Sequence, residues 1–271
     1  ATPEEAARLR DVRTIYLDET QDLTAGDLMT LKALITGHLI MAADIQQSIY
    51  GVSSPFARAG LRISGRTRIL RTNFRNTRQI HAAAQRFSAT DDDGLFAFRE
   101  GPIPEVYQAE TQAQLDPLLV QKLRLFLDHL GYEPDNICIL APHNRAVAHL
   151  AELLGEERVD SSVITEKEFR FTDSGAVRLS TLHSSKGLDF PVVMLYLPYL
   201  QRRTTFDEET TERLLRNLIY VGFTRAMENL NAFVCPGDDP ILKDVCRALA
   251  ARGSNGDIAP EPSSGGSDGN V

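Results

Sequence analysis

Residues 192–197 read "VVMLYL", six apolar residues in a row, and residues 38–43 read "HLIMAA", which is apolar after its first residue. A strand with one face in water alternates apolar and polar residues, whereas a strand of a parallel sheet is covered on both faces and stays apolar throughout. Helical patterns separate many of the predicted strands, as parallel pairing requires. The sequence therefore predicts an α/β fold in which helices cover both faces of a parallel sheet.

Hydrophobic periodicity places the individual elements. Strands are predicted at 14–19, 38–43, 67–74, 136–141, 176–183, 191–197 and 229–235. Helices are predicted at 24–36, 76–88, 113–130, 144–154, 208–227 and 239–251.

The composition is that of a globular protein. The 271 residues suffice for one large or two ordinary domains, and 42% hydrophobic with 24% charged residues is ordinary. No apolar run is long enough to span a membrane, and the first ten residues lack the apolar core of an export signal. We expect a cytoplasmic protein without a membrane partner.

Cys138, Cys235 and Cys246 lack CxxC spacing, so reduced core thiols are expected and not disulfides or a zinc site.

Charge is unevenly distributed along the chain. The net charge is −8, yet residues 45–90 hold no acidic residue and carry eight arginines: Arg58, Arg62, Arg66, Arg68, Arg71, Arg75, Arg78 and Arg86. A solvated surface would explain the charge, but lysine would serve that purpose equally well. Arginine is the residue that binds phosphate or carboxylate through two parallel hydrogen bonds. The segment therefore favours phosphate recognition by some of these side chains.

Two acids follow the predicted strand at 14–19. In open α/β sheets, ligands bind beyond the carboxyl ends of the strands, where Asp18 and Glu19 are expected. One acid could hold Mg²⁺, often through water, and its neighbour could orient or deprotonate an attacking water. Equally, an acid at this position could cap the following helix. The acidic pair alone does not decide between the two interpretations.

Four more clusters of polar residues occur at the ends of predicted strands or within a predicted helix. Together with the acids they form an ordered set of motifs. These are "LDETQD" at 17–22, "ADIQQSIYG" at 43–51, "LRTNFRNT" at 70–77, "LSTLHSSKGLDF" at 179–190 and "LIYVGFTRA" at 218–226. In this order they closely resemble motifs II to VI of the UvrD/Rep family of superfamily 1 DNA helicases. The resemblance covers about residues 13–235.

The resemblance implies a RecA-like fold of the P-loop NTPase type, with ATP and Mg²⁺ as cofactors and single-stranded or partly duplex DNA as partner. It implies that Asp18 binds Mg²⁺ and that Glu19 activates the hydrolytic water. The remaining implied roles are γ-phosphate contact for Gln47, Arg75 and Arg225, adenine stacking for Phe74, ribose contact for Asp189, and DNA contact for Tyr50, Thr181 and His183.

The chain also departs from the family pattern. No G-x-x-x-x-G-K-[ST] phosphate loop occurs, and Leu214 and Leu215 align with a pair of acids. We interpret residues 1–62 as the end of a first RecA-like domain, residues 63–252 as a complete second one, and residues 253–271 as a disordered tail. Without the phosphate loop, this fragment alone is expected to lack ATPase activity.

Two functions remain open. The first is the C-terminal part of an ATP-dependent DNA helicase that translocates 3′ to 5′, and the second is a non-catalytic remnant that binds DNA or protein. Three structural expectations follow from the motifs. The strands at 14–19 and 38–43 should be parallel neighbours, with Asp18 and Asp44 at the same end. Phe74 should be partly exposed, and Arg75 should lack a buried carboxylate partner.

Overall fold

The computed structural model describes residues 12–34, 37–43, 55–63, 65–68, 70, 72–88, 96–166, 169–170, 172, 175–202 and 206–250. Predictions about Asp44, Gln47, Tyr50 and the tail at 253–271 fall outside these residues.

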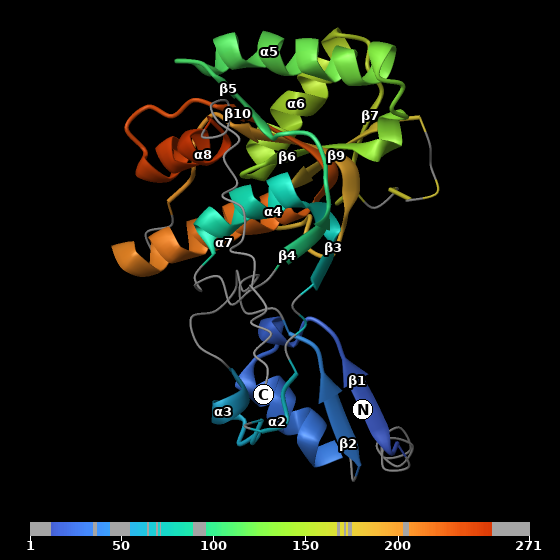
Figure 1. Ribbon diagram of the computed structural model, residues 1–271, viewed down its shortest axis with the longest axis vertical. Helices are drawn as coiled ribbons and strands as arrows, with labels where there is room; N and C mark the ends of the chain where they lie inside the picture. The colour runs from blue at the N-terminus through green and yellow to red at the C-terminus, as the bar shows by residue number, and fades with distance from the viewer. Residues whose placement is uncertain are drawn as a thin grey trace, which may run out of the picture.

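A six-stranded parallel sheet forms the centre of the larger unit (Figure 1). Its strands lie in the order β5 (Glu105–Gln108), β10 (Ala226–Val234), β9 (Phe190–Leu197), β6 (Ile137–Ala141), β8 (Val177–Thr181) and β7 (Ser161–Val163). Every neighbouring pair in this sheet is parallel. The predicted α/β fold class is confirmed.

Helices cover the two faces of this sheet. The helices α4 (Arg78–Ala84), α7 (Glu208–Thr224) and α8 (Pro240–Ala250) pack on one face, while α5 (Gln112–Arg124) and α6 (Asn144–Glu156) pack on the other (Figure 1).

Strand β9 shows why its sequence is apolar throughout. Val193 and Leu195 belong to the core beneath α7, whereas Val192 and Met194 belong to the core beneath α5 and α6. Successive side chains of a strand point to opposite faces of the sheet, so the side chains on both faces of β9 are buried. The strand therefore lacks the alternation of apolar and polar residues that a strand with one face in water shows.

A smaller unit precedes the large sheet in the chain. It pairs β1 (Thr14–Leu17) with β2 (His38–Met41), connected through a 3₁₀ turn (Thr20–Asp22) and α2 (Ala25–Leu34), and followed by α3 (Pro55–Arg58). The two strands are parallel, with Thr14 opposite His38, which confirms their predicted pairing. Its small core centres on Leu28, Phe56 and Ala59.

A third, two-stranded sheet joins β3 (Thr72–Thr77) to β4 (Phe96–Arg99) in parallel. It lies at the end of the larger unit that faces the smaller one (Figure 1). The strand predicted at 67–74 was therefore placed too early: the apolar Leu70 is exposed, and the strand is built instead from the mostly polar residues 72–77.

Other boundaries differ from the prediction for local reasons. The helix predicted at 113–130 is α-helical to Arg124 and continues as a π-helical turn at Leu125–His129. The helix predicted at 76–88 comprises α4 and a 3₁₀ turn at Gln85–Phe87. Strands β4, β5 and β7 and helix α3 were missed because three or four residues are too few to display a period.

The three cysteines are free thiols, and two of them are buried, as predicted. Burial raises the pKa of the Cys138 thiol far above its ordinary value. Within the described residues, no helix combines the length and the apolar character that crossing a bilayer requires.

Substitution of Gly222 tests how tightly α7 packs against the six-stranded sheet. A Cβ at Gly222 would lie 2.5 Å from Leu182 Cδ2 and 3.2 Å from Leu195 Cδ2, whereas a Cβ at Gly155 in α6 would meet nothing within 4 Å. We predict that Gly222→Ala lowers the free energy of unfolding by about 1–3 kcal/mol. The control Gly155→Ala should raise it by up to about 1 kcal/mol, because alanine favours the helix. Urea unfolding followed by circular dichroism measures both, and equal effects would contradict the packing described.

Candidate functional site

One carboxylate joins two of the predicted site arginines. Asp189 Oδ2 lies 2.9 Å from Arg75 Nε, and Asp189 Oδ1 lies 3.7 Å from Arg225 Nη1. The three residues come from β3, from the turn that leads into β9, and from the C-terminal end of α7. The structure thus brings together residues from three of the quoted motifs, of which the first and the last are about 150 residues apart in the chain.

Arg225 is 1% exposed, so its guanidinium must find partners inside the protein. Its Nε donates to the carbonyl of Val221 at 3.1 Å, and its Nη1 donates to the carbonyl of Leu188 at 3.1 Å. A third contact runs from Nη2 to Thr224 Oγ1 at 3.3 Å. These bonds hold the guanidinium in one place beside Asp189.

Two asparagines shape the segment that presents Phe74 and Arg75. Asn73 Oδ1 accepts hydrogen bonds from the backbone N–H of Arg75 at 2.9 Å and of Asn76 at 3.1 Å. Asn76 Nδ2 in turn donates to the carbonyl of Thr224 at 3.0 Å, next to Arg225 in the chain. The two arginines are therefore connected by hydrogen bonds as well as through Asp189.

Phe74 and Arg75 differ in how far they match the expectations for this segment. Phe74 is 69% exposed, which confirms the predicted exposure. Arg75 has a carboxylate partner that was not expected, although Asp189, at 28% exposed, is not a buried one. The pairing escaped prediction because it depends on tertiary contact between distant segments.

The acids of "LDETQD" do not cap the following helix. Thr24 does so: its Oγ1 accepts from the N–H of Asp27 at 3.1 Å, while Asp27 Oδ2 accepts from the N–H of Thr24 at 2.9 Å. Asp18 is exposed, and its Oδ1 accepts from the N–H of Glu19 at 2.8 Å. Glu19 has a φ of 51°, a left-handed conformation that residues with a Cβ rarely adopt.

Lys186 links the smaller unit to the larger one. Its Nζ lies 2.7 Å from Asp22 Oδ1 and 3.6 Å from Glu19 Oε2, and its side chain is only 9% exposed. It lies in the turn between β8 and β9, three residues before Asp189. Lys186 belongs to the motif at 179–190, and no role was predicted for it.

The donor set of the smaller unit suits Mg²⁺. Mg²⁺ binds oxygen ligands and usually keeps several waters, taking one or two carboxylates from the protein and further ligands from phosphates. Asp18 is an exposed carboxylate that can serve as such a ligand. Among the residues described, no group of three or more His, Cys, Asp and Glu side chains could hold a metal by itself, so phosphate and water would complete the coordination.

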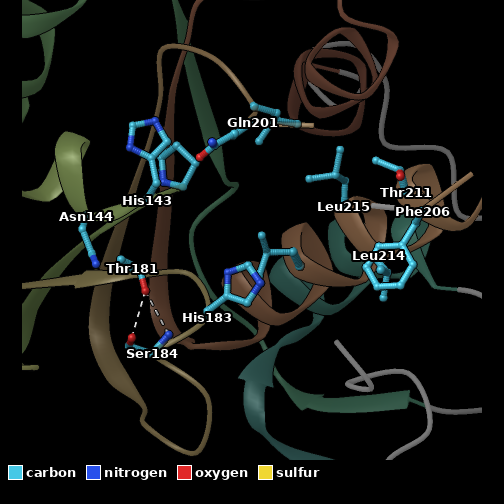
Figure 2. A pocket seen from close by; sticks show the side chains of 13 residues that line it. His143, Asn144, Thr181, His183, Ser184, Gln201, Phe206, Thr211, Leu214 and Leu215 are labelled. Carbon is cyan, nitrogen blue, oxygen red and sulfur yellow. Dashed lines mark hydrogen bonds between the residues drawn. The ribbon is translucent and has the colours of Figure 1, made fainter. Parts of the chain in front are cut away.

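A pocket of about 460 Å³ contains the predicted DNA contacts Thr181 and His183 (Figure 2). Thr181 Oγ1 donates to Ser184 Oγ at 2.9 Å and accepts from the N–H of Ser184 at 3.1 Å, which fixes the turn after β8. The remaining lining includes polar residues on one side and Leu214 and Leu215 of α7 on the other. The two leucines are those that replace acids in the motif pattern, so this wall of the pocket is apolar.

Sequence reasoning missed His143 and Asn144, which line the same pocket from the start of α6. His143 Nδ1 accepts from the N–H of Ala146 at 3.1 Å, so the residue caps α6. Burial, together with the charge of Arg145, lowers the pKa of His143 and favours the neutral imidazole. The helical period after residue 144 was visible in the sequence, and an N-cap search that included histidine would have found this residue.

Comparison with known proteins bears on these features directly. Residues 164–235 match the UvrD-like helicase C-terminal domain. The predicted resemblance to the UvrD/Rep family is confirmed. The matched segment contains Thr181, His183, Lys186, Asp189 and Arg225.

Three curated relatives illustrate the similarity. ATP-dependent DNA helicase Rep of Salmonella typhimurium is 32% identical over 108 residues, covering 34% of this chain and 16% of Rep. PcrA of Leuconostoc citreum is 48% identical over 68 residues, covering 22% and 9%. UvrD1 of Mycobacterium tuberculosis is 32% identical over 158 residues, covering 51% and 19%. The chain thus spans less than a fifth of the length of each of these relatives.

A solved structure described as the C-terminal domain of a possible DNA helicase from Lactobacillus plantarum WCFS1 is 19% identical. It aligns with a TM-score of 0.49, covering 65% of this chain and 96% of that one. The fold class rests on the strand order of the six-stranded sheet and not on this match.

The contact made by Lys186 can be tested by substitution. We predict that Lys186→Gln weakens the attachment of residues 12–43 by about 1–2 kcal/mol, because Asp22 loses its charged partner. Hydrogen exchange of the backbone amides in β1 and β2 should become faster, while exchange in β6 and β9 stays unchanged. Lys243→Gln, which removes an exposed pair with Asp238, is the matched control and should change neither region. Unchanged exchange in Lys186→Gln would show that the contact does not hold the smaller unit.

Proposed function

We propose that this chain is the C-terminal part of an ATP-dependent DNA helicase that moves 3′ to 5′ on single-stranded DNA and couples this movement to ATP hydrolysis. The observation that carries the proposal is that Arg75 and Arg225 both pair with Asp189. Asp189 and Arg225 lie in the segment that matches the UvrD-like domain, and Arg75 lies on β3. The relatives named above, all called ATP-dependent DNA helicases, support the same reading.

In this proposal, Arg75 and Arg225 bind the γ-phosphate of ATP. Phosphate oxygens offer a guanidinium the same bidentate, charge-assisted hydrogen bonds that a carboxylate offers, so phosphate can replace Asp189 as the partner of Arg75. Guanidinium groups stabilise the charge that builds on a transferred phosphoryl group. When the phosphate leaves, Arg75 returns to Asp189, and this exchange of partners provides a route from hydrolysis to movement of the domains.

The acidic pair supplies the other half of the chemistry. Asp18 would hold Mg²⁺, which neutralises charge on the phosphate oxygens, and Glu19 would orient the attacking water. The left-handed backbone of Glu19 is a local strain of the kind that accompanies functional positions. Lys186 keeps the Glu19 carboxylate near the larger unit. Gln47 would sense the γ-phosphate, Phe74 would stack on adenine, and Asp189 would reach the ribose when nucleotide is bound.

The pocket at the end of β8 would receive single-stranded or partly duplex DNA. Thr181 and His183 would contact it, joined by Tyr50 and by His143 and Asn144 at the start of α6. Aromatic and imidazole faces stack on unpaired bases, and hydroxyl and amide groups donate to phosphates. The apolar wall formed by Leu214 and Leu215 suits the face of a base better than a phosphate. A DNA partner implies a cytoplasmic location, which stays a prediction.

The domain assignment belongs to the same proposal. Residues 1–62 would end a first RecA-like domain, and residues 63–252 would form the second. The small core around Leu28 and Phe56 supports this division, because it is separate from the two cores of the six-stranded sheet.

A second candidate function is a non-catalytic module that binds DNA or protein. The observation in its favour is that the 271 residues contain no G-x-x-x-x-G-K-[ST] loop to cradle the phosphates. The two candidates differ in whether Glu19 and Arg75 matter for turnover.

DNA-stimulated release of phosphate from ATP tests the proposed function. In a protein that carries this chain together with a phosphate-binding loop, we predict that Arg75→Ala lowers turnover by about 100-fold or more, because a transition-state arginine is lost. Arg78→Ala is the matched control: Arg78 is also exposed and pairs with Glu100, and its loss should leave turnover unchanged. The 271 residues alone should release no phosphate.

Two results would count against this account. Unchanged turnover in Arg75→Ala would show that Arg75 is a surface charge without a role in turnover and would favour the non-catalytic alternative. Phosphate release by the 271 residues that disappears in Glu19→Gln would show a complete catalytic site in this chain, assembled within it or between two copies.

A further inference from the structure

A single residue, Arg225, separates helix α7 from strand β10. The helix ends at Thr224 and the strand begins at Ala226, so the chain passes from helix to strand without a loop. The last carbonyl groups of a helix have no partner within the helix, and other groups must bind them. The position of Arg225 therefore depends on the groups that bind the carbonyls at this junction.

Asn76 of β3 binds the carbonyls on both sides of Arg225. Its Nδ2 donates to the carbonyl of Thr224 at 3.0 Å and to the carbonyl of Ala226 at 2.6 Å. The carbonyl of Arg225 itself accepts from the N–H of Phe190 at 3.0 Å. Three successive carbonyls are thus bound by groups of β3 and β9, which fixes the backbone that carries the Arg225 guanidinium.

The other end of the Asn76 amide contacts the segment that carries Arg75. Asn76 Oδ1 accepts from Asn73 Nδ2 at 2.8 Å, and Asn73 Oδ1 accepts from the backbone N–H of Arg75 at 2.9 Å. A side-chain amide has one accepting and one donating end, so the two bonds to carbonyls determine the orientation of Asn76, and Asn76 in turn determines that of Asn73. A continuous chain of hydrogen bonds therefore connects the backbone at Arg75 with the backbone at Arg225.

The local fold gives no other reason for an asparagine at this position. Asparagine is depleted in β-strands. It is not needed as a helix cap either, because Thr77 caps α4 by accepting from the N–H of Ile80 at 3.4 Å. Asn76 is only 2% exposed, so removal of its amide would leave buried carbonyls without a partner. These observations favour a role for Asn76 in the contact with the Arg225 junction.

We propose that Asn76 is a positioning residue that couples Arg75 to Arg225, so that the two guanidinium groups act on the phosphate as one unit. The inference rests on the proposed function and adds to it a residue that contacts no substrate. Asp189 joins the arginines through their side chains, and that link is lost when phosphate replaces Asp189 as the partner of Arg75. Asn76 joins the backbones and does not compete with phosphate, so it keeps the arginines aligned during the exchange.

Substitution of Asn76 tests the coupling in the protein used for the turnover assay above. Asn76→Ala should lower the kcat of ATP hydrolysis about 10- to 100-fold, because a displacement of about 1 Å in a catalytic group has an effect of this size. The KM for ATP should stay nearly the same, because the arginines act on charge that builds in the transition state. Asn229→Ala is the matched control: Asn229 of β10 donates to Tyr132 Oη at 2.8 Å, and its loss should leave kcat unchanged.

A double-mutant cycle separates coupling from a general loss of stability. If Asn76 acts through Arg75, Asn76→Ala should lower kcat where Arg75 is present and have little further effect in the Arg75→Ala background. A purely structural defect would lower kcat by the same factor in both backgrounds. Circular dichroism checks that each variant is folded. If Asn76→Ala does not fold, Asn76→Ser, which keeps a hydroxyl donor, takes its place in the cycle.

Several outcomes would overturn the proposal. Unchanged kcat in Asn76→Ala, while Arg75→Ala lowers it, removes the positioning role and leaves the proposed function intact. Equal losses from Asn76→Ala in the two backgrounds would show that Asn76 supports the fold alone. A raised KM with unchanged kcat would assign Asn76 to nucleotide binding and not to coupling. Unchanged kcat in Arg75→Ala would overturn the proposed function and the coupling together.

Discussion

The Asp189 carboxylate holds a buried arginine and an exposed one at the same point, and the arrangement of the site depends on it. A guanidinium as buried as that of Arg225 requires a nearby negative charge and acceptors for its donors. The carbonyls of Val221 and Leu188 supply the acceptors, and Asp189 supplies the charge. With the second oxygen of Asp189 bound to Arg75, the end of α7, the start of β9 and the β3 segment are fixed together.

The parallel sheet makes this meeting possible. The turn between β8 and β9 carries Lys186 toward the smaller unit and Asp189 toward the arginines, so one short segment contacts both halves of the proposed nucleotide site. The residue pair Asn73 and Asn76 performs the corresponding task on β3. A change in the partner of Arg75 would therefore alter the contacts of β3, which carries Arg75, and of the turn between β8 and β9, which contacts the acids.

The sequence predicted the long elements well because burial on both faces leaves an unmistakable apolar run, as in β9, and because amphipathic helices such as α6 have a clear period. It missed β4 and β5, whose four residues cannot display a period. The predicted roles came from motif order, while the pairing of Asp189 with Arg75 and of Lys186 with Asp22 depends on tertiary contacts that no local pattern encodes.

An NMR titration of the arginine side chains tests directly whether Arg75 and Arg225 bind the nucleotide together. In chain labelled with ¹⁵N, the Nε–H signals of Arg75 and Arg225 can be assigned with Arg75→Lys and Arg225→Lys and followed as ATP and Mg²⁺ are added. The Arg75 signal should move strongly as phosphate replaces Asp189, and the Arg225 signal should move with the same concentration dependence. If both signals stay in place while ATP saturates the protein by another measure, the two arginines do not bind the nucleotide and the account is wrong.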